Sequence, residues 1–289
     1  EQFRAPPSFL ADLVHEIEQG QNQYPPSDGI PELQTAVTEF YARELRVRFP
    51  AKSVVICGGA RPPIYAVFQC LVGEGDQVLF CAPSWDNDYY THLCGAQARV
   101  LQTRAENNFF PTVQDITDSI ADPAVRLVCL NSPSNPCGTV ISLEVLRGIS
   151  QAIVEANLRR ASRGERPVFL LYDQVYWPLT FGARLHHHPI EVVPAIAPWV
   201  IYIDAISKWM VGTGLRLGWA VVPTYIYAPL RDFMGHVGAW APRPVQVATA
   251  KFLRNELAFQ EYIQELRAAL QARLSAVYVF FQEMVRRGL

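Results

Sequence analysis

One lysine stands out in the stretch YIDAISKWMVGTGLRLGWAVVP, residues 202–223. Mostly apolar residues lead to Lys208, and Arg216 follows eight positions later with glycines between the two. An amine among apolar neighbours loses hydration, and the neutral form of an amine attacks aldehydes. A guanidinium group is a planar donor that suits phosphate. We therefore expect Lys208 to be a dehydrated nucleophile and Arg216 to bind an anion in the same site.

Other polar side chains with useful chemistry follow other apolar runs. Asp173 comes directly after the run VFLLY, and Tyr176 lies three residues further along. Asp173 is suited to hold a protonated ring nitrogen, whereas Tyr176 and Asn135 are suited to hydrogen-bond a phenolate oxygen. Trp85 offers a flat face on which a ring can stack. These residue types together describe a site for a flat, nitrogen-containing ring.

A glycine turn adds a site for an anion. Gly58, Gly59, Ala60 and Arg61 precede a helical pattern, and free backbone N–H groups at the start of a helix bind phosphate. Two prolines follow at 62–63, within the first helical turn, where a missing N–H costs least. An aldehyde, a pyridine nitrogen, a ring hydroxyl and a phosphate are the features of pyridoxal 5′-phosphate (PLP), which we expect as the cofactor.

The elements that must position these residues alternate along the chain. Strands are predicted from short apolar, β-branched runs at 53–57, 77–81, 98–102, 126–130, 167–172, 199–204 and 217–222. Helices are predicted at 8–19, 31–46, 61–72, 87–94, 113–120, 143–160 and 244–286, the last perhaps with a break. This alternation predicts an α/β fold with a mostly parallel, seven-stranded sheet covered by helices on both faces. Ligands of such sheets bind at the carboxyl ends of the strands, where the polar residues above would meet.

Composition excludes several classes of partner. The chain has 289 residues, half of them hydrophobic and 18% charged, with a formal net charge of −2 and no basic run. Nucleic acid and anionic membrane are therefore not expected as partners. The longest apolar runs are too short to span a bilayer. The six cysteines show no CxxC spacing, which is typical of reduced thiols in a cytoplasmic protein.

Six segments, in order, resemble motifs of the class I/II aminotransferases among the fold-type-I PLP enzymes. They are YPPSDGIPEL (24–33), GGARPPIY (58–65), PSWDN (83–87), NSPSNPCGT (131–139), YDQVY (172–176) and SKWMVGTGLRLGW (207–219). The resemblance implies a PLP-dependent aminotransferase that moves an amino group from an L-amino acid to a 2-oxo acid. It also implies a homodimer that shares its active sites, in which Tyr24 reaches the phosphate of the neighbouring subunit.

The resemblance assigns a role to each matching residue. Lys208 would form the Schiff base, Asp173 would contact the ring nitrogen and Tyr176 would act with it in catalysis. The remaining cofactor contacts would come from Gly59, Ala60, Arg61, Trp85, Asn135, Ser207 and Arg216. Two alternatives remain open. One is another PLP enzyme of the same fold, such as a C–S or β-lyase or a decarboxylase, and the other is a non-catalytic PLP-sensing regulatory module.

The sequence also departs from the family pattern. Ala205 stands where the family often has a phosphate-binding serine, and Cys137 replaces the commoner threonine. The family's arginine for the substrate carboxylate lies in a small carboxyl-terminal domain, which we expect to be largely missing from this chain. We accordingly expect an amino-terminal arm at 1–30, a large PLP-binding domain at 31–245 and a long helix at 246–289 leading towards that small domain.

A histidine triplet at 186–188 invites a metal interpretation, which we decline. Three consecutive side chains cannot all face one ion from a regular element, and no nearby spacing of Cys or acidic residues supports a metal site. We expect the triplet to lie in a solvated loop.

Overall fold

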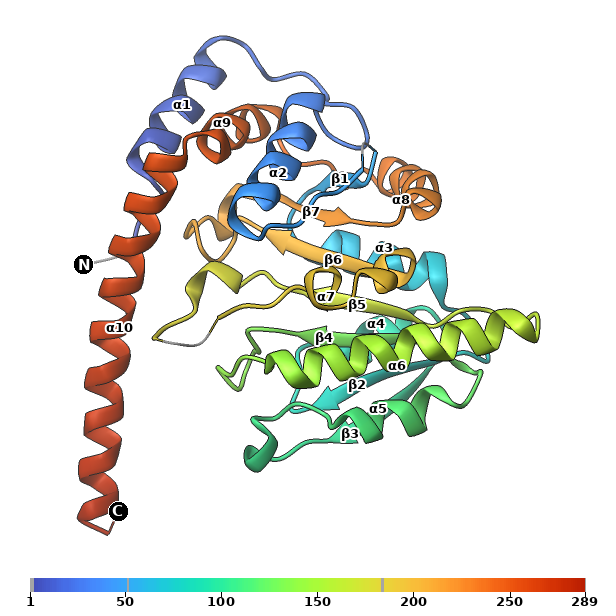
Figure 1. The fold of residues 1–289 in the computed structure, drawn as a ribbon. Helices are drawn as coiled ribbons and strands as arrows, with labels where there is room; N and C mark the ends of the chain where they lie inside the picture. Colours follow the sequence, from blue (N-terminus) through green and yellow to red (C-terminus); the bar gives the residue numbers. More distant parts are fainter. Residues whose placement is uncertain (1–2, 51, 183–184, 289) are drawn as a thin grey trace.

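The computed structural model describes residues 3–50, 52–182 and 185–288, and its centre is a seven-stranded sheet (Figure 1). The strand order is β1-β7-β6-β5-β4-β2-β3. The strands are β1 (Val54–Cys57), β2 (Gln77–Ala82), β3 (Gln97–Gln102), β4 (Val125–Asn131), β5 (Phe169–Asp173), β6 (Val200–Ala205) and β7 (Gly218–Val221). β7 is antiparallel to both of its neighbours, and the other paired strands are parallel. The predicted α/β class is confirmed.

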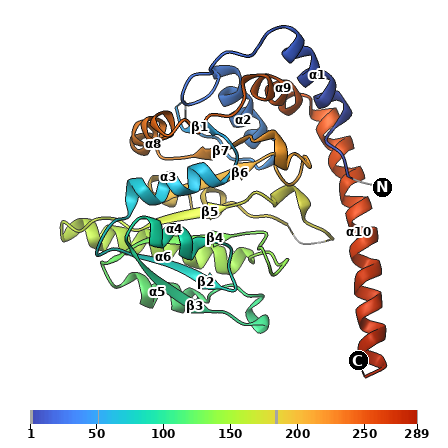
Figure 2. The same cartoon turned by 180° about the vertical axis from the view of Figure 1, so that it is seen from behind.

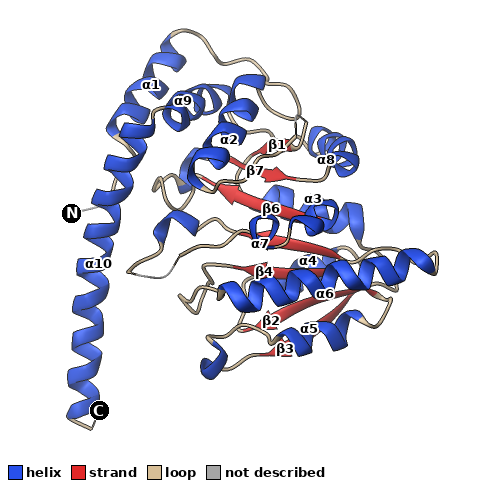
Figure 3. Ribbon diagram, viewed as in Figure 1, coloured by secondary structure: helices blue, strands red, loops and turns tan. Residues whose placement is uncertain are grey.

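Helices cover both faces of this sheet, as Figure 3 shows. They are α1 (Pro7–Glu18), α2 (Pro31–Glu44), α3 (Arg61–Leu71), α4 (Asn87–Leu93), α5 (Val113–Ile120), α6 (Leu143–Ser162), α7 (Pro189–Val192), α8 (Thr224–His236), α9 (Arg243–Arg254) and α10 (Glu256–Arg286). Among the described residues, no helix is both long and apolar enough to cross a membrane. Most predicted helices lie within a few residues of their expected bounds, whereas the short α7 and the longer α8 were not predicted. Pro229 lies inside α8 and interrupts the pattern by which a helix is recognised.

Apart from the largely exposed edge strand β3, the strands direct alternating side chains into two separate cores. On β6, Tyr202 packs in the core beneath α2, α6 and α9, whereas Ile203 packs in the core beneath α3, α4 and α8. The same alternation places Tyr172 and Leu171 of β5 on opposite faces. The sheet is therefore buried on both sides, and its carboxyl-end edge is left to form a site.

Local signals explain where several helices begin. Thr112 and Asp115 form a reciprocal capping box at the start of α5, and the Ser142 hydroxyl accepts the amide of Val145 at the start of α6. α3 begins at Arg61 and carries its two prolines in the first turn, as predicted. The helix that follows β1 thus starts directly at the glycine turn.

The predicted stretch 244–286 is two helices. Asn255 ends α9, and its side chain accepts the amide of Ala258 to cap α10. α9 packs against α1 and α2, while α10 runs past the carboxyl ends of the parallel strands (Figures 1 and 2). The break therefore separates a helix that belongs to the packed layer from one that leaves it.

The prediction of a solvated histidine loop is wrong for two of its members. His188 is buried and its ring stacks on Tyr202 with centroids 3.8 Å apart. The ring of His186 lies against Tyr172, and its Nε2 is 3.3 Å from Gln174 Oε1. Burial lowers the pKa of His186 to about 3 and the pKa of His188 well below its usual value, so both rings are neutral. These partners are aromatic residues of distant strands, which the local sequence could not reveal.

Candidate active site

A pocket lies where β4, β5 and β6 end, and most of the predicted site residues line it. Its lining comprises Ala60, Arg61, Ile64, Trp85, Asn131, Asn135, Asp173, Val175, Tyr176, Ser207, Lys208, Thr213 and Arg216. Nine of the eleven predicted residues are among them, and Gly59 and Tyr24 are not. The rule that ligand sites form at the carboxyl ends of parallel strands therefore located the pocket.

Asp173 is the last residue of β5 and pairs in register with Asn131, the last residue of β4. Its Oδ1 accepts the amide of Val175 at 3.1 Å. Burial raises the pKa of the Asp173 carboxyl to about 6, although the Val175 amide and the charge of Lys208 act in the opposite direction. A dehydrated carboxylate of this kind gains from a cationic N–H partner in the pocket.

A phenol and an amide lie next to this carboxylate. Asn135 donates through Nδ2 to the Tyr176 hydroxyl at 3.3 Å, and its own backbone amide donates to Asn131 Oδ1 at 2.7 Å. Burial and the charge of Asp173 raise the pKa of the Tyr176 phenol. The Tyr176 hydroxyl therefore remains protonated and available as a donor near neutral pH.

Lys208 lies in the turn that follows β6, and its position corrects one expectation. Its neighbours Ser207 and Trp209 are buried, but the Lys208 side chain itself is exposed. The Nζ atom lies 5.8 Å from the centroid of the Tyr176 ring. The predicted dehydration of Lys208 is thus wrong for this structure, because the turn directs the side chain into an open pocket.

Arg216 has a left-handed backbone (φ 53°) and reaches back to the glycine turn. It donates through Nη2 to the Gly58 carbonyl and through Nη1 to the Thr213 carbonyl, each at 2.8 Å. Gly59 has φ +103°, and a Cβ there would lie 2.4 Å from Arg216 Nη2. Glycine is therefore required for the guanidinium group to approach the start of α3.

The groups expected to bind the phosphate differ in whether they already have partners within the protein. The Gly59 amide donates to the Cys57 carbonyl at 2.8 Å, whereas Ala60 and Arg61 line the pocket. The Arg61 guanidinium lies 4.5 Å from the centroid of the Trp85 ring and pairs with Asp86 at 2.9 Å. Arg61 therefore covers part of the aromatic face that was expected to stack on a ring.

Tyr24 lies outside the pocket of its own chain. It is 80% exposed, and its ring meets Trp240 edge-on with centroids 5.1 Å apart. The segment around Trp240 contacts this chain's own glycine turn, because the Gly58 amide donates to the Ala239 carbonyl at 2.8 Å. Tyr24 is consequently presented on the surface beside the turn.

Sequence reasoning missed four residues of the pocket lining, namely Ile64, Asn131, Val175 and Thr213. Asn131 was the easiest to find, because it ends β4 in register with Asp173 and donates to the Asp173 carbonyl at 3.1 Å. Thr213 lies between Lys208 and Arg216, and its contribution depends on a turn conformation that no motif encodes.

The residues in this pocket fit PLP. The dehydrated Asp173 carboxylate matches a protonated ring nitrogen, and the phenol of Tyr176 with the amide of Asn135 matches a ring oxygen. Arg216 and the start of α3 form a cationic cradle at the far side, where glycine alone leaves room. Lys208 supplies the amine in the same pocket.

Comparison with known proteins agrees with this fit. The family described as aminotransferase class I and II matches residues 5–288. An aspartate aminotransferase of Geobacillus stearothermophilus is 26% identical over 277 residues, covering 96% of this chain and 67% of that protein. An aspartate/prephenate aminotransferase of Thermus thermophilus is 25% identical over 258 residues, covering 89% of this chain and 63% of that protein.

Solved structures show the same fold. The N-succinyldiaminopimelate aminotransferase from Mycobacterium tuberculosis superimposes with a TM-score of 0.88 and 26% identity, covering 98% of this chain and 70% of that one. The aspartate aminotransferase from Thermus thermophilus with maleate gives a TM-score of 0.86 at 24% identity, covering 94% and 68%. The present chain thus spans about two thirds of the length of proteins that it resembles.

Proposed function

Because the chain belongs to the class I and II aminotransferase family, we propose that it transfers an amino group from an L-amino acid to a 2-oxo acid with PLP held in this pocket. The observation that carries the proposal is the convergence of Lys208, Asp173 and Arg216 in one pocket at the carboxyl ends of the strands. When bound, PLP supplies an electron sink that stabilises negative charge at the substrate Cα.

Asp173 keeps the ring nitrogen protonated in this proposal. An adjacent anion raises the pKa of a cationic group, and a protonated ring withdraws electrons more strongly. Tyr176 and Asn135 orient the ring by hydrogen-bonding its oxygen, which is supported by their direct contact. Trp85 limits the tilt of the ring from one side.

Lys208 performs the proton transfer. Its Nζ would hold the cofactor through the aldehyde group, and its amine would move the proton at the substrate Cα as general base and then as general acid. Arg216, with Gly59, Ala60 and Arg61 at the start of α3 and Ser207 beside the lysine, anchors the phosphate so that the ring stays in place during this transfer.

The proposal extends to partners and setting. Aspartate is the first amino donor to test, because two of the similar proteins are named for it. We propose a homodimer in which the exposed Tyr24 reaches the phosphate of the neighbouring subunit. The cysteines at 57, 70, 81, 94, 129 and 137 are all free, which supports a reducing, cytoplasmic setting. We also propose that 1–30 is an arm, 31–245 the large domain and 246–289 the connection to a small domain.

Borohydride reduction followed by peptide mass mapping tests the cofactor site. The protein is mixed with PLP, reduced and digested, and we expect the pyridoxyl mass on the peptide that contains Lys208. The Lys208→Ala variant serves as the matched control and should carry no adduct. An adduct on a different lysine, or equal labelling of the variant, would overturn the assignment.

Product analysis then tests the reaction. Adding aspartate without a 2-oxo acid should release one equivalent of keto acid per bound PLP and no free ammonia. Release of ammonia with pyruvate from a suitable β-substituted amino acid would instead indicate a lyase, and release of carbon dioxide would indicate a decarboxylase. Spectral change without any product would indicate a sensing module.

A further inference from the structure

A buried polar cluster lies behind the pocket, on the opposite face of the sheet. Its members, which we call the Asp204 cluster, are Tyr41, Gln174, Trp177, Asp204 and Trp219. Asp204 follows Tyr202 by two positions on β6 and therefore faces the α2 side, whereas the pocket opens beyond Ile203 and Ala205. A buried acid near the end of such an apolar strand is costly unless its carboxylate is hydrogen-bonded.

Hydrogen bonds converge on the Asp204 carboxylate. Its Oδ2 accepts the Tyr41 hydroxyl at 2.7 Å and Trp177 Nε1 at 2.8 Å, and its Oδ1 accepts the Ala205 amide at 2.7 Å. The Tyr41 oxygen in turn accepts Trp219 Nε1 at 2.8 Å and Gln174 Nε2 at 3.2 Å. The Asp204 carboxylate thus accepts Tyr41 and Trp177 directly, whereas Trp219 and Gln174 reach it through the Tyr41 hydroxyl.

Three members of the cluster, Gln174, Trp177 and Asp204, belong to segments that carry a pocket residue. Gln174 directly follows Asp173, and Trp177 directly follows Tyr176. Along β6, Asp204 itself precedes the turn with Lys208. One side of each segment lines the pocket, and the other side is connected to the Asp204 carboxylate, directly for Trp177 and through the Tyr41 hydroxyl for Gln174.

The electrostatic setting of Asp204 supports a link to the pocket. Burial, and to a smaller extent the charge of Asp173, raises the pKa of Asp204 to about 7, while the bonds from Tyr41 and Trp177 act against this. On the other side of the cluster, Gln174 Oε1 contacts the neutral ring of His186. The charge of Asp173 therefore reaches Asp204 across the sheet, in addition to the hydrogen-bonded connection.

We propose that Asp204 is a positioning residue of the cofactor site, which holds the segments of Asp173 and Tyr176 in register through its bonds to Trp177 and Tyr41. This inference rests on the proposed function, because it concerns how well the pocket holds PLP. Residues that orient a ligand from behind typically contribute tenfold or more to affinity without contacting it.

The test is Asp204→Asn, which keeps the side-chain shape but places an amide against the groups that donate to the carboxylate. We expect the dissociation constant of PLP to rise about tenfold. We also expect the pH midpoint of the absorbance of bound PLP to fall by about half a unit, because a nearby negative charge is lost. Tyr41→Phe removes one arm and should change both quantities in the same direction by less.

Asn157→Leu is the control for a merely structural role. Asn157 is equally buried and exchanges two 2.8 Å bonds with the backbone of Val168, at the other end of the β5 segment. We expect it to lower the melting temperature as much as Asp204→Asn while leaving PLP affinity and the pH midpoint unchanged.

Two results would overturn the inference. One is a PLP affinity and midpoint of the Asp204→Asn variant equal to those of the parent protein, and the other is an equal change in the Asn157→Leu control. If Asp204→Asn does not fold, the same comparison is made with Tyr41→Phe. Failure of the parent protein to bind PLP at Lys208 would instead refute the proposed function, so the two failures are distinguishable.

Discussion

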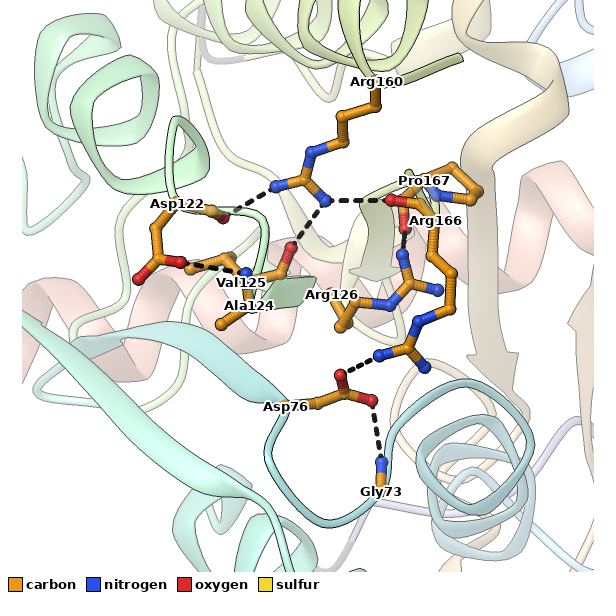
Figure 4. Close-up of polar contacts among 9 residues, drawn as sticks. All are labelled: Gly73, Asp76, Asp122, Ala124, Val125, Arg126, Arg160, Arg166 and Pro167. Carbon is orange, nitrogen blue, oxygen red and sulfur yellow. Dashed lines mark hydrogen bonds and ion pairs between the residues drawn. The ribbon is translucent and has the colours of Figure 1, made fainter. Parts of the chain in front are cut away.

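The amino ends of β2, β4 and β5 carry a cluster of charged side chains, as do the carboxyl ends of β4 to β6 that form the pocket. At the amino ends, Arg160 donates to the carbonyls of Asp122, Val125 and Arg166 at 2.8–3.3 Å (Figure 4). It also donates to the carbonyl of Ile120 at 2.9 Å. The Figure also shows Arg126 donating to the carbonyl of Pro167, and Arg166 paired with the buried carboxylate of Asp76. This arginine cluster uses its charges to close the backbone at the ends of strands and helices.

At the carboxyl ends the polar groups are arranged differently. The Asp173 carboxylate accepts the amide of Val175, in its own turn, at 3.1 Å, and the exposed Lys208 side chain extends into the open pocket. Burial leaves the pKa of Asp173 raised to about 6, which is a cost to the folded chain at neutral pH. The difference suggests a criterion: a charge whose partners are backbone groups stabilises the fold, whereas a dehydrated charge facing a pocket awaits a ligand.

The largest difference between an effect on activity and an effect on stability is expected at Lys208. Lys208→Ala should lower transamination by about 10³-fold or more, because the variant loses the group that moves the Cα proton. The free energy of unfolding should change by less than about 0.5 kcal/mol, because the side chain is exposed. Steady-state kinetics and urea denaturation of the same preparation measure both. A variant that unfolds easily would show that the pocket end is also structural.

Arg160→Leu is expected to lower stability and leave activity unchanged, the opposite of Lys208→Ala. Four carbonyl oxygens lose their donor, so the free energy of unfolding should fall by about 3 kcal/mol or more, while activity per folded molecule is unchanged. Arg159→Leu is the matched control, because the exposed Arg159 only approaches Glu155 at 3.8 Å and should contribute less than about 0.5 kcal/mol. Loss of activity in folded Arg160→Leu would contradict the separation of the two ends.

The two ends of the sheet can also be compared by replacing an aspartate with asparagine at each of them. Asp76→Asn should destabilise the protein by about 1–3 kcal/mol, because the buried carboxylate accepts the Gly73 amide and pairs with Arg166. Asp173→Asn should instead stabilise the cofactor-free protein at pH 8, by about 1–3 kcal/mol. The opposite signs follow from the different partners of the two carboxylates.

The pH dependence of stability tests whether Asp173→Asn stabilises the cofactor-free protein as predicted. Its pKa is raised from 3.8 to about 6 in the folded chain, so the folded state binds more protons than the unfolded state between these values. Stability therefore falls as pH rises through this window, and the gain from Asp173→Asn should vanish below about pH 4. Melting curves of the cofactor-free proteins from pH 4 to 8 measure this, and a gain that is independent of pH would refute the explanation.

Much of the site could be predicted because one rule of topology places the ends of parallel strands together. Asp173 and Asn135 followed from apolar runs and turn residues whose order fixes their position on the edge. Exposure of Lys208 could not be predicted, because it depends on the direction of a turn. The free surface position of Tyr24 likewise depends on packing around Trp240.

The features that the sequence did not reveal depend on contacts between distant segments. Helix α8 was missed because Pro229 lies within it. Burial of His188 depends on Tyr202, and Asp204 was missed because its donors lie on α2 and in the turn after β5. A local pattern reports the element in which a residue lies, but not the side chains that meet it from other elements.

The smallest effect is expected at Arg216, where lysine keeps the positive charge but not the planar geometry of the guanidinium group. Arg216→Lys keeps the positive charge but cannot maintain both 2.8 Å bonds, to Gly58 and Thr213, that hold the planar group beside the glycine turn. PLP affinity should fall about tenfold, or about 1.4 kcal/mol, while pyridoxal, which lacks the phosphate, should bind as before. At the arginine cluster, Arg160→Lys should reduce stability and leave PLP binding intact. Equal weakening of PLP and pyridoxal by Arg216→Lys would mean that Arg216 supports the turn rather than the phosphate, and would place it with Arg160 among the charges that serve the backbone.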